Sequence, residues 1–133
     1  MSSARKQQCL LVEDNKVNQR VATAILGRLG YTVDLAEDGV QAVEMAASLP
    51  YDVVLMDVHL PKMDGYQATV KIRENVTVWE QPTVVALTAS ALAEERQRCL
   101  DAGMSAFISK PIQLEALVET LKDIPPALSV SPS

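Results

Sequence analysis

The chain has 133 residues, of which 48% are hydrophobic and 22% charged, a composition typical of one globular domain with a core of ordinary size. Its formal net charge of −5, without any run of lysine and arginine, argues against direct binding to nucleic acid. No apolar stretch approaches about 20 residues and no signal peptide is recognisable, so we expect a cytoplasmic protein without direct membrane contact. Cys9 and Cys99 lie far apart in apolar segments, which predicts two buried thiols.

The two ends of the chain differ in composition from the part between them. Residues 1–7 are mostly polar, and residues 125–133, PPALSVSPS, are rich in proline and serine. We expect a flexible N-terminus, one domain over residues 8–124 and a disordered C-terminal tail over residues 125–133.

Strand and helix signals alternate five times along the domain. Continuous apolar, β-prone runs predict strands, which are, in chain order, Cys9–Val12, Thr32–Ala36, Val53–Met56, Thr83–Thr88 and Ala106–Ser109. Apolar residues at helical spacing predict the helices between and after them, which cover, in chain order, residues 17–29, 40–47, 66–74, 92–102 and 114–121. In the second helix, Val40, Val43 and Ala47 share one face.

Apolar strands that alternate with helices indicate an α/β fold with a parallel sheet covered on both faces. Five strands in a chain of this length, joined by right-handed crossovers, suggest a flavodoxin-like, doubly wound sheet with strand order 2-1-3-4-5.

Polar residues stand at the ends of four of these strands. Glu13 and Asp14 follow the first strand, and Asp57 ends the third. Thr88 ends the fourth strand, and Lys110 follows the fifth. Because functional sites of open α/β sheets lie at the carboxyl ends of the strands, we expect these side chains to converge.

Three neighbouring carboxylates repel one another unless a cation joins them, which predicts a divalent metal site with oxygen ligands, most simply Mg²⁺. A nucleophilic carboxylate, an ammonium group and a hydroxyl beside that metal fit phosphoryl transfer to an aspartate. Each residue alone also has a structural explanation. An acidic residue at a strand end often caps a helix or lies in a solvated loop, and a threonine or lysine there is ordinary. The occurrence of the whole set favours the functional interpretation.

Three other functions share parts of this pattern. A haloacid-dehalogenase-type phosphatase also uses an aspartate at a strand end, but it expects a second aspartate where this chain has His59. A flavin or nucleotide binder shares the architecture, although neither GxGxxG nor GxxxxGK[ST] occurs. A scaffold of this architecture that never takes a phosphoryl group usually lacks an acidic residue, the threonine or the lysine, and all of these are present here.

Four motifs together give the chain a resemblance to response-regulator receiver domains, over about residues 8–123. They are LLVEDNKVNQ at 10–19, VVLMDVHLPKMDGY at 53–66, ALTAS at 86–90 and AFISKPI at 106–112. In the second motif, Gly65 permits a close backbone approach or a positive φ, and Asp64 can cap the next helix.

The resemblance implies roles for the polar set. Asp57 corresponds to the phosphoacceptor, Asp14 to a direct ligand of Mg²⁺ (or Mn²⁺), and Glu13 to a group that acts on the metal mainly through water. The backbone carbonyl of His59 corresponds to a further metal ligand. Lys110 corresponds to the residue that pairs with the phosphoryl group.

The resemblance also implies a switch. Thr88 corresponds to the hydroxyl that moves toward the attached phosphoryl group, and Phe107 to the aromatic side chain that changes rotamer with it, although Phe107 could instead be simple core. The side chains of His59 and Ser90 occupy positions that influence the lifetime of the phosphoryl group, with a solvated loop residue as the alternative for His59. The Lys110–Pro111 peptide bond is expected to be cis.

The resemblance further implies partners. Asn15 and Asn18 are typical of receivers of hybrid histidine kinases and phosphorelays, so we expect a histidine kinase and/or a histidine phosphotransfer domain as donor. Val17 and Val21 would help to form its docking surface, with plain core as the alternative. We expect a monomer or weak dimer, and a signalling domain that catalyses only its own phosphorylation and dephosphorylation, not an enzyme that turns over small substrates.

The output would pass through the surface of the fourth helix, the fifth strand and the last helix, centred on residues 91–104 and 106–109. No output domain follows Asp123 in this sequence. We therefore expect the output to be a partner surface, an onward phosphotransfer or a domain outside this sequence.

Overall fold

The computed structural model describes residues 7–60, 62–75, 82–88, 92–110 and 112–122. The strands are β1 (Gln7–Val12), β2 (Tyr31–Ala36), β3 (Val53–Asp57), β4 (Thr83–Thr88) and β5 (Ala106–Ser109). The helices are α1 (Lys16–Arg28), α2 (Gly39–Ser48), α3 (Gly65–Asn75), α4 (Ala93–Ala102) and α5 (Leu114–Leu121). Each predicted strand and helix is present, with bounds shifted by a few residues at most.

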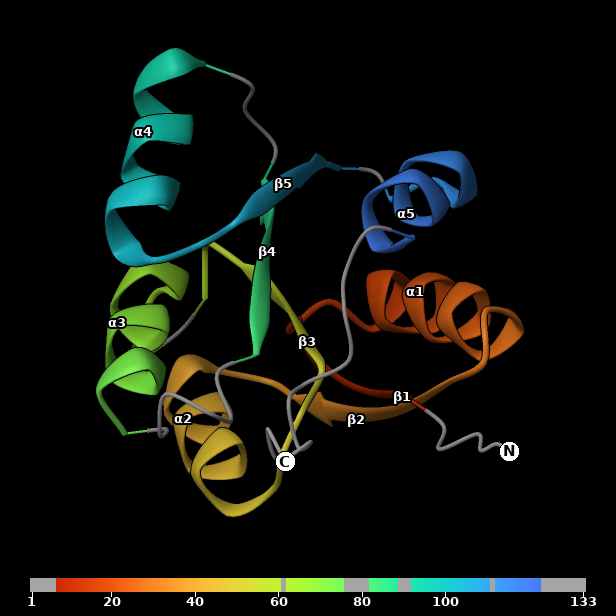
Figure 1. Cartoon of the computed structure of the whole chain (residues 1–133), viewed down its shortest axis with the longest axis horizontal. Helices are drawn as coiled ribbons and strands as arrows, with labels where there is room; N and C mark the ends of the chain where they lie inside the picture. The colour runs from red at the N-terminus through yellow and green to blue at the C-terminus, as the bar shows by residue number, and fades with distance from the viewer. Residues whose placement is uncertain (1–6, 61, 76–81, 89–91, 111, 123–133) are drawn as a thin grey trace, which may run out of the picture.

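The strands form one sheet in the order β2-β1-β3-β4-β5, and every neighbouring pair is parallel, which confirms the predicted fold class and strand order. Helices α1 and α5 cover one face of the sheet, and α2, α3 and α4 cover the other (Figure 1). Because all neighbouring strands are parallel, their carboxyl ends lie at the same edge of the sheet. The switch point, where the order of the strands reverses direction, lies between β1 and β3 at that edge.

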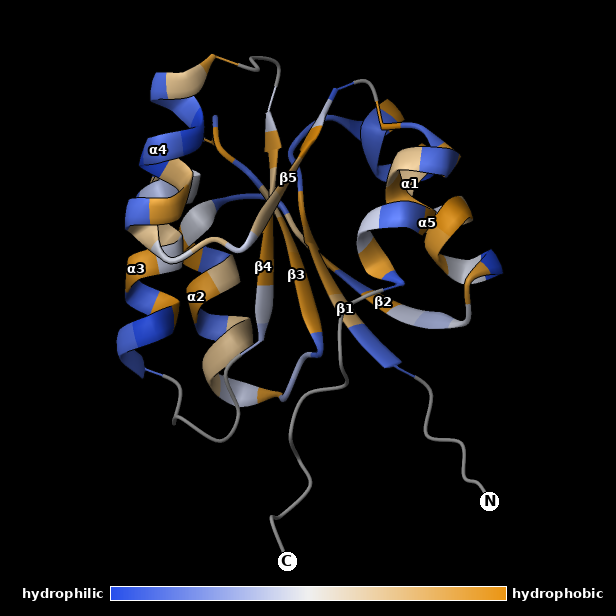
Figure 2. Cartoon of the chain, turned by 45° about the horizontal axis from the view of Figure 1, so that its top comes forward, coloured by the Kyte–Doolittle hydropathy of each residue, from blue (hydrophilic) through white to orange (hydrophobic). Residues whose placement is uncertain are grey.

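Two hydrophobic cores lie on the two faces of the sheet, and alternate residues of each strand supply them. Leu10 and Val12 of β1 belong to the core under α2, α3 and α4, whereas Cys9 and Leu11 belong to the core under α1 and α5. The central strands are hydrophobic along most of their length, between helices that carry polar residues on their outer sides (Figure 2). This pattern is what a sheet buried on both faces requires. Cys9 and Cys99 are both completely buried, as predicted.

In helices α1 and α2, the face that is buried against the sheet differs from the face predicted from the spacing of large apolar residues. Helix α2 buries Ala42 and Ala46, while Val40 is 39% exposed. Helix α1 buries Gln19, Ala22 and Leu26. Small residues at the contacts let α2 lie close to its neighbours, which leaves the bulkier Val40 at the edge of the contact.

On the outer side of α1, Val17 is 66% exposed and Val21 is 41% exposed. The alternative that these two valines are plain core residues is therefore wrong. The stretches 1–6 and 125–133 lie outside the described residues, and Gln7 is the first residue of β1. Among the described residues, no helix is long and apolar enough to cross a membrane.

Candidate active site

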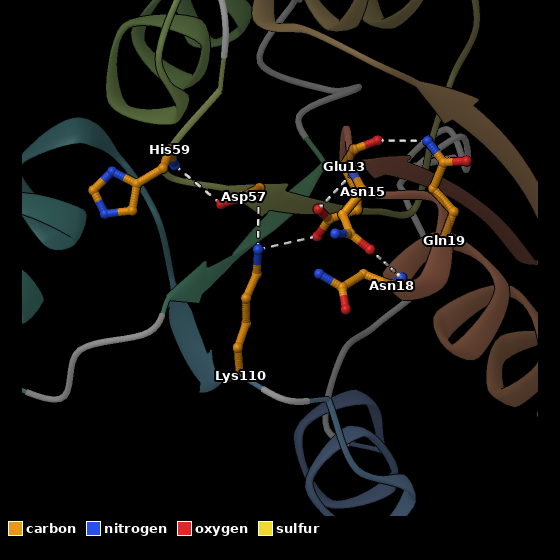
Figure 3. Close-up of polar contacts among 7 residues, drawn as sticks. All are labelled: Glu13, Asn15, Asn18, Gln19, Asp57, His59 and Lys110. Carbon is orange, nitrogen blue, oxygen red and sulfur yellow. Dashed lines mark hydrogen bonds and ion pairs between the residues drawn. The ribbon is translucent and has the colours of Figure 1, made fainter.

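Asp57, the last residue of β3, has a nearly fully buried carboxylate with a different partner for each oxygen. Oδ1 accepts a hydrogen bond from the His59 backbone N–H at 3.0 Å, and Oδ2 accepts one from Lys110 Nζ at 2.7 Å (Figure 3). Charge-assisted hydrogen bonds of this kind offset part of the cost of burying a carboxylate. They also fix the orientation of the group at the carboxyl edge of the sheet.

Glu13, directly after β1, is completely buried. Its Oε2 accepts a hydrogen bond from the Asn15 backbone N–H at 3.1 Å, and its Oε1 lies 3.2 Å from Lys110 Nζ in an ion pair. The Gln19 side chain donates a hydrogen bond to the Glu13 carbonyl at 2.7 Å, which ties the end of β1 to the first turn of α1. Hydrogen bonds to the side chain and to the carbonyl of Glu13 therefore fix the backbone after β1.

Lys110 joins the two buried carboxylates. Its ammonium lies between Asp57 and Glu13 (Figure 3), and its backbone N–H donates to the Thr88 carbonyl at 2.8 Å. Burial by itself would lower the pKa of Lys110, but the hydrogen bonds and negative charges of Asp57 and Glu13 outweigh it and raise that pKa. The ammonium is therefore a permanent positive charge at neutral pH, placed beside the Asp57 oxygen.

The predicted acidic cluster is present. Glu13, Asp14 and Asp57 each offer a carboxylate oxygen, and these oxygens lie within 4.8 Å of one another. Glu13 and Asp57 are buried, whereas Asp14 is exposed to solvent. A hard divalent cation such as Mg²⁺ takes oxygen ligands and keeps several waters, so this partly open donor set fits it.

Thr88 and Phe107 lie on neighbouring strands. Thr88 ends β4 and is 4% exposed. Phe107 of β5 pairs in register with Ala86, is half-buried against the core under α2, α3 and α4, and has the Arg96 guanidinium over its ring. The ring is thus neither free in solvent nor fully enclosed.

His59 is exposed, and its imidazole points away from the Asp57 carboxylate (Figure 3). Its backbone, in contrast, contacts that carboxylate through the N–H described above. This orientation favours the solvated-loop interpretation of the side chain in this conformation. The predictions for Ser90 and for the Lys110–Pro111 bond involve residues 90 and 111, which lie outside the described residues.

The turn after β3 depends on Gly65. A Cβ built on Gly65 would lie 2.8 Å from Val58 Cα and would overlap the Asp57 carbonyl, and the Gly65 N–H donates to the Val58 carbonyl at 3.1 Å. The loop can therefore fold back against the acceptor only because this residue has no side chain. Asp64 caps α3 by accepting a hydrogen bond from the Gln67 N–H at 2.9 Å. Both expectations for this turn are confirmed.

Two supporting residues were not predicted. Asn15 is the N-cap of α1, with its Oδ1 accepting from the Asn18 N–H at 3.0 Å, and Gln19 is the buried amide that holds the Glu13 carbonyl. Asn15 follows the two acidic residues, so a capping preference could have identified it. Gln19 lies on the buried face of α1 with Ala22 and Leu26, and the spacing of apolar residues alone does not identify that face.

Comparisons with known proteins agree with this geometry. Residues 9–122 match the response regulator receiver domain family. The chain is 46% identical over 113 residues to the sensor histidine kinase RcsC of Salmonella typhi, an alignment that covers 84% of this chain and 12% of that protein. The chain thus spans about an eighth of the length of that relative.

Two solved structures are similar over most of the chain. One is the receiver domain of the sensor histidine kinase PA1611 from Pseudomonas aeruginosa PAO1, with a magnesium ion coordinated in its active site cleft. It has 45% identity and a TM-score of 0.81, and the match covers 90% of this chain and 98% of that one. The other is the receiver domain of Ssk1, solved with the histidine phosphotransfer protein Ypd1 of Saccharomyces cerevisiae. It has 27% identity and a TM-score of 0.83, with 90% and 88% coverage.

The family match covers nearly all of the domain, and the shared fold places a carboxylate, a lysine and an acidic cluster at the switch point of the sheet. The chain therefore belongs to the response regulator receiver domain family, with relatives among the histidine kinases that carry such domains.

Proposed function

We propose that Asp57 accepts a phosphoryl group from a phosphohistidine of a partner protein. The observation that carries the proposal is the Asp57 carboxylate itself, buried, fixed at both oxygens and paired with Lys110 Nζ at 2.7 Å. One Asp57 oxygen attacks phosphorus, so a P–O bond forms as the P–N bond to the histidine breaks. The histidine nitrogen leaves with the electron pair and takes a proton from solvent.

The residues of this chain prepare that transfer in three ways. The His59 N–H and Lys110 hold the carboxylate oxygens in place, which supports an in-line approach. Lys110 provides positive charge for the transferred group. Asp14, Asp57 and the His59 carbonyl are the proposed direct ligands of Mg²⁺ (or Mn²⁺), and Glu13 acts on the metal mainly through water. When bound, the metal would neutralise charge on the phosphoryl oxygens.

A histidine phosphotransfer domain is the partner that we propose as donor, with a histidine kinase as the other source of the phosphohistidine. The complex of the Ssk1 receiver with Ypd1 supports this class of partner. Val17 and Val21 give the N-terminal half of α1 an exposed apolar surface next to Asp14 in the chain. Exposed apolar side chains beside a polar site are typical of protein docking surfaces.

The phosphoryl group would then act through Thr88 and Phe107. It adds about −1.5 to −2 charges beside Asp57, which draws the Thr88 hydroxyl and Lys110 toward it. Phe107 would fill the space that Thr88 leaves, and the surface of α4, β5 and α5 would change. The domain is in this proposal a signalling module that phosphorylates itself, not an enzyme for small substrates. The influence of His59 and Ser90 on phosphoryl lifetime stays a prediction.

The experiment measures label transfer from a ³²P-phosphorylated histidine phosphotransfer domain in the presence of Mg²⁺. Wild type and Asp57→Asn are compared with Asp64→Asn as the matched control, because Asp64 caps α3 and an asparagine can accept the same hydrogen bond. We expect base-labile label on wild type and on Asp64→Asn, and none on Asp57→Asn. Label that persists on Asp57→Asn overturns the proposal.

A further inference from the structure

Helix α4 is held unevenly along its length. Its buried residues, Cys99 and Ala102, both lie in the C-terminal half. At the other end, Leu92 is 65% exposed. In Figures 1 and 2 the first turns of α4 lie beyond the N-terminal end of α3. The N-terminal half of α4 is thus the less firmly packed half.

The C-terminal end of α4 is clamped by Arg73 of α3. The Arg73 guanidinium donates to the Gly103 carbonyl from Nε at 3.2 Å and from Nη2 at 2.7 Å, and Nη1 donates to the Pro82 carbonyl at 2.6 Å. Gly103 ends the helix with φ of 103°, and a Cβ there would lie 3.2 Å from Arg73 Cγ. A half-buried arginine with three such bonds fixes this end of α4 to the start of β4.

Two cation–π contacts connect the rest of α4 to the domain. The Arg96 guanidinium carbon lies 5.0 Å from the centroid of the Phe107 ring, and that of Arg98 lies 4.2 Å from the centroid of the Tyr66 ring. Both distances are within the range of an attractive contact. The two contacts have the same chemistry and the same helix in common, but only Arg96 touches the ring that belongs to the proposed switch.

We propose that Arg96 is a positioning residue that holds Phe107 in its resting position and so couples the switch to the N-terminal half of α4. Arg73 keeps the other end of the helix fixed, so the first turns of α4 follow the ring when it moves. This inference rests on the proposed function, in which Phe107 changes position after Asp57 is phosphorylated.

The size of the effect follows from the strength of an exposed cation–π contact. Its loss shifts the equilibrium between the resting and switched positions of the ring by about two- to fivefold. A ligand that binds the switched form then binds more tightly by the same factor, because its apparent affinity is proportional to the population of that form. Removal of Arg96 therefore raises sensitivity to a phosphoryl mimic without any change at Asp57.

Phe107 is the only phenylalanine of the chain, which gives a specific probe of the ring. The full chain, labelled with ring-¹³C phenylalanine, is titrated with beryllium fluoride in the presence of Mg²⁺, and the ring signals are followed by NMR. The variants are Arg96→Met, which keeps the apolar stem, Arg96→Lys, which keeps the positive charge, and Arg98→Met, which removes the matched contact with Tyr66. Arg96 and Arg98 are both exposed, so these changes leave the core intact.

The expected result has three parts. In Arg96→Met the midpoint of the titration falls by about two- to fivefold, and the resting ring signals move toward their saturated positions. Arg96→Lys restores part of the wild-type midpoint. Arg98→Met has the wild-type midpoint.

Two results overturn the inference. An Arg96→Met midpoint equal to that of wild type shows that the contact does not hold the ring. Equal shifts in Arg96→Met and Arg98→Met show a general loosening of α4. Failure of the proposed function looks different, because the ring signals of wild type itself would then not respond to beryllium fluoride.

Discussion

Replacing Lys110 by methionine removes the side chain that, among the described residues, is paired with both buried carboxylates, Glu13 and Asp57. Oxygens of these two groups lie within 4.8 Å of each other. At an effective dielectric constant of about 20, two unit charges at that distance repel each other by about 3.5 kcal/mol. In the wild type the Lys110 ammonium offsets this repulsion. Water that enters the opened site screens part of this repulsion. We therefore expect Lys110→Met to lower the free energy of unfolding of the metal-free chain by about 2–3 kcal/mol.

Urea unfolding at pH 7, followed by circular dichroism, measures this loss. Lys122→Met is the matched control, because Lys122 forms an exposed ion pair with Glu119 at 3.2 Å and should change the free energy of unfolding by less than about 0.5 kcal/mol. Added MgCl₂ should restore part of the stability of Lys110→Met, since a bound divalent cation neutralises the same carboxylates. A Lys110→Met variant as stable as wild type without metal would refute the reasoning.

Three other predictions concern the supporting structure. Gly65→Ala should lower the free energy of unfolding by about 2 kcal/mol or more, measured by urea unfolding, since the new Cβ would overlap backbone atoms of Asp57 and Val58. Gly27→Ala, at a position in α1 with open space around it, should raise the free energy of unfolding by about 0.5–1 kcal/mol. Equal effects of the two substitutions would contradict the account. Asn15→Ala should cost about 1 kcal/mol in the same assay through loss of the α1 cap, and Asn15→Ser should recover most of it. Burial, helped by the charge of Asp52, raises the pKa of Tyr31 from 10.0 to about 12. The stability that this contributes is present below pH 10 and is lost as pH rises through 12. Tyr31→Phe should therefore lose less stability than wild type between about pH 9 and 11, and parallel losses would count against this prediction.

The ends of the strands could be predicted from the sequence because a buried parallel strand is apolar throughout and its first polar residue marks the edge of the sheet. Asp57 and Thr88 were identified in this way, and the parallel order then brought Glu13 and Lys110 to the same edge. Each polar residue had a simple local explanation. Their assembly depended on topology, which a small number of rules restrict.

The helix faces and the side-chain directions could not be predicted in the same way. Periodicity gives the angle between residues of a helix but not the direction in which the sheet lies, so the burial of Ala46 in place of Val40 is visible only in three dimensions. Gln19 is a polar side chain inside the contact because it holds the Glu13 carbonyl, a partner six positions away. The outward direction of the His59 imidazole depends on the turn after β3, which sequence spacing does not determine.

The central claim is that one carboxylate of the acidic cluster accepts phosphorus, and chemical mapping tests it most directly. The chain is incubated with a phosphohistidine donor and Mg²⁺, treated with hydroxylamine to convert an acyl phosphate to a hydroxamate, and analysed by tandem mass spectrometry. We predict a hydroxamate at Asp57 that requires both donor and Mg²⁺. A hydroxamate at Glu13, Asp14 or Asp64 in its place, or none under conditions where the donor loses its phosphoryl group to the chain, would contradict the account.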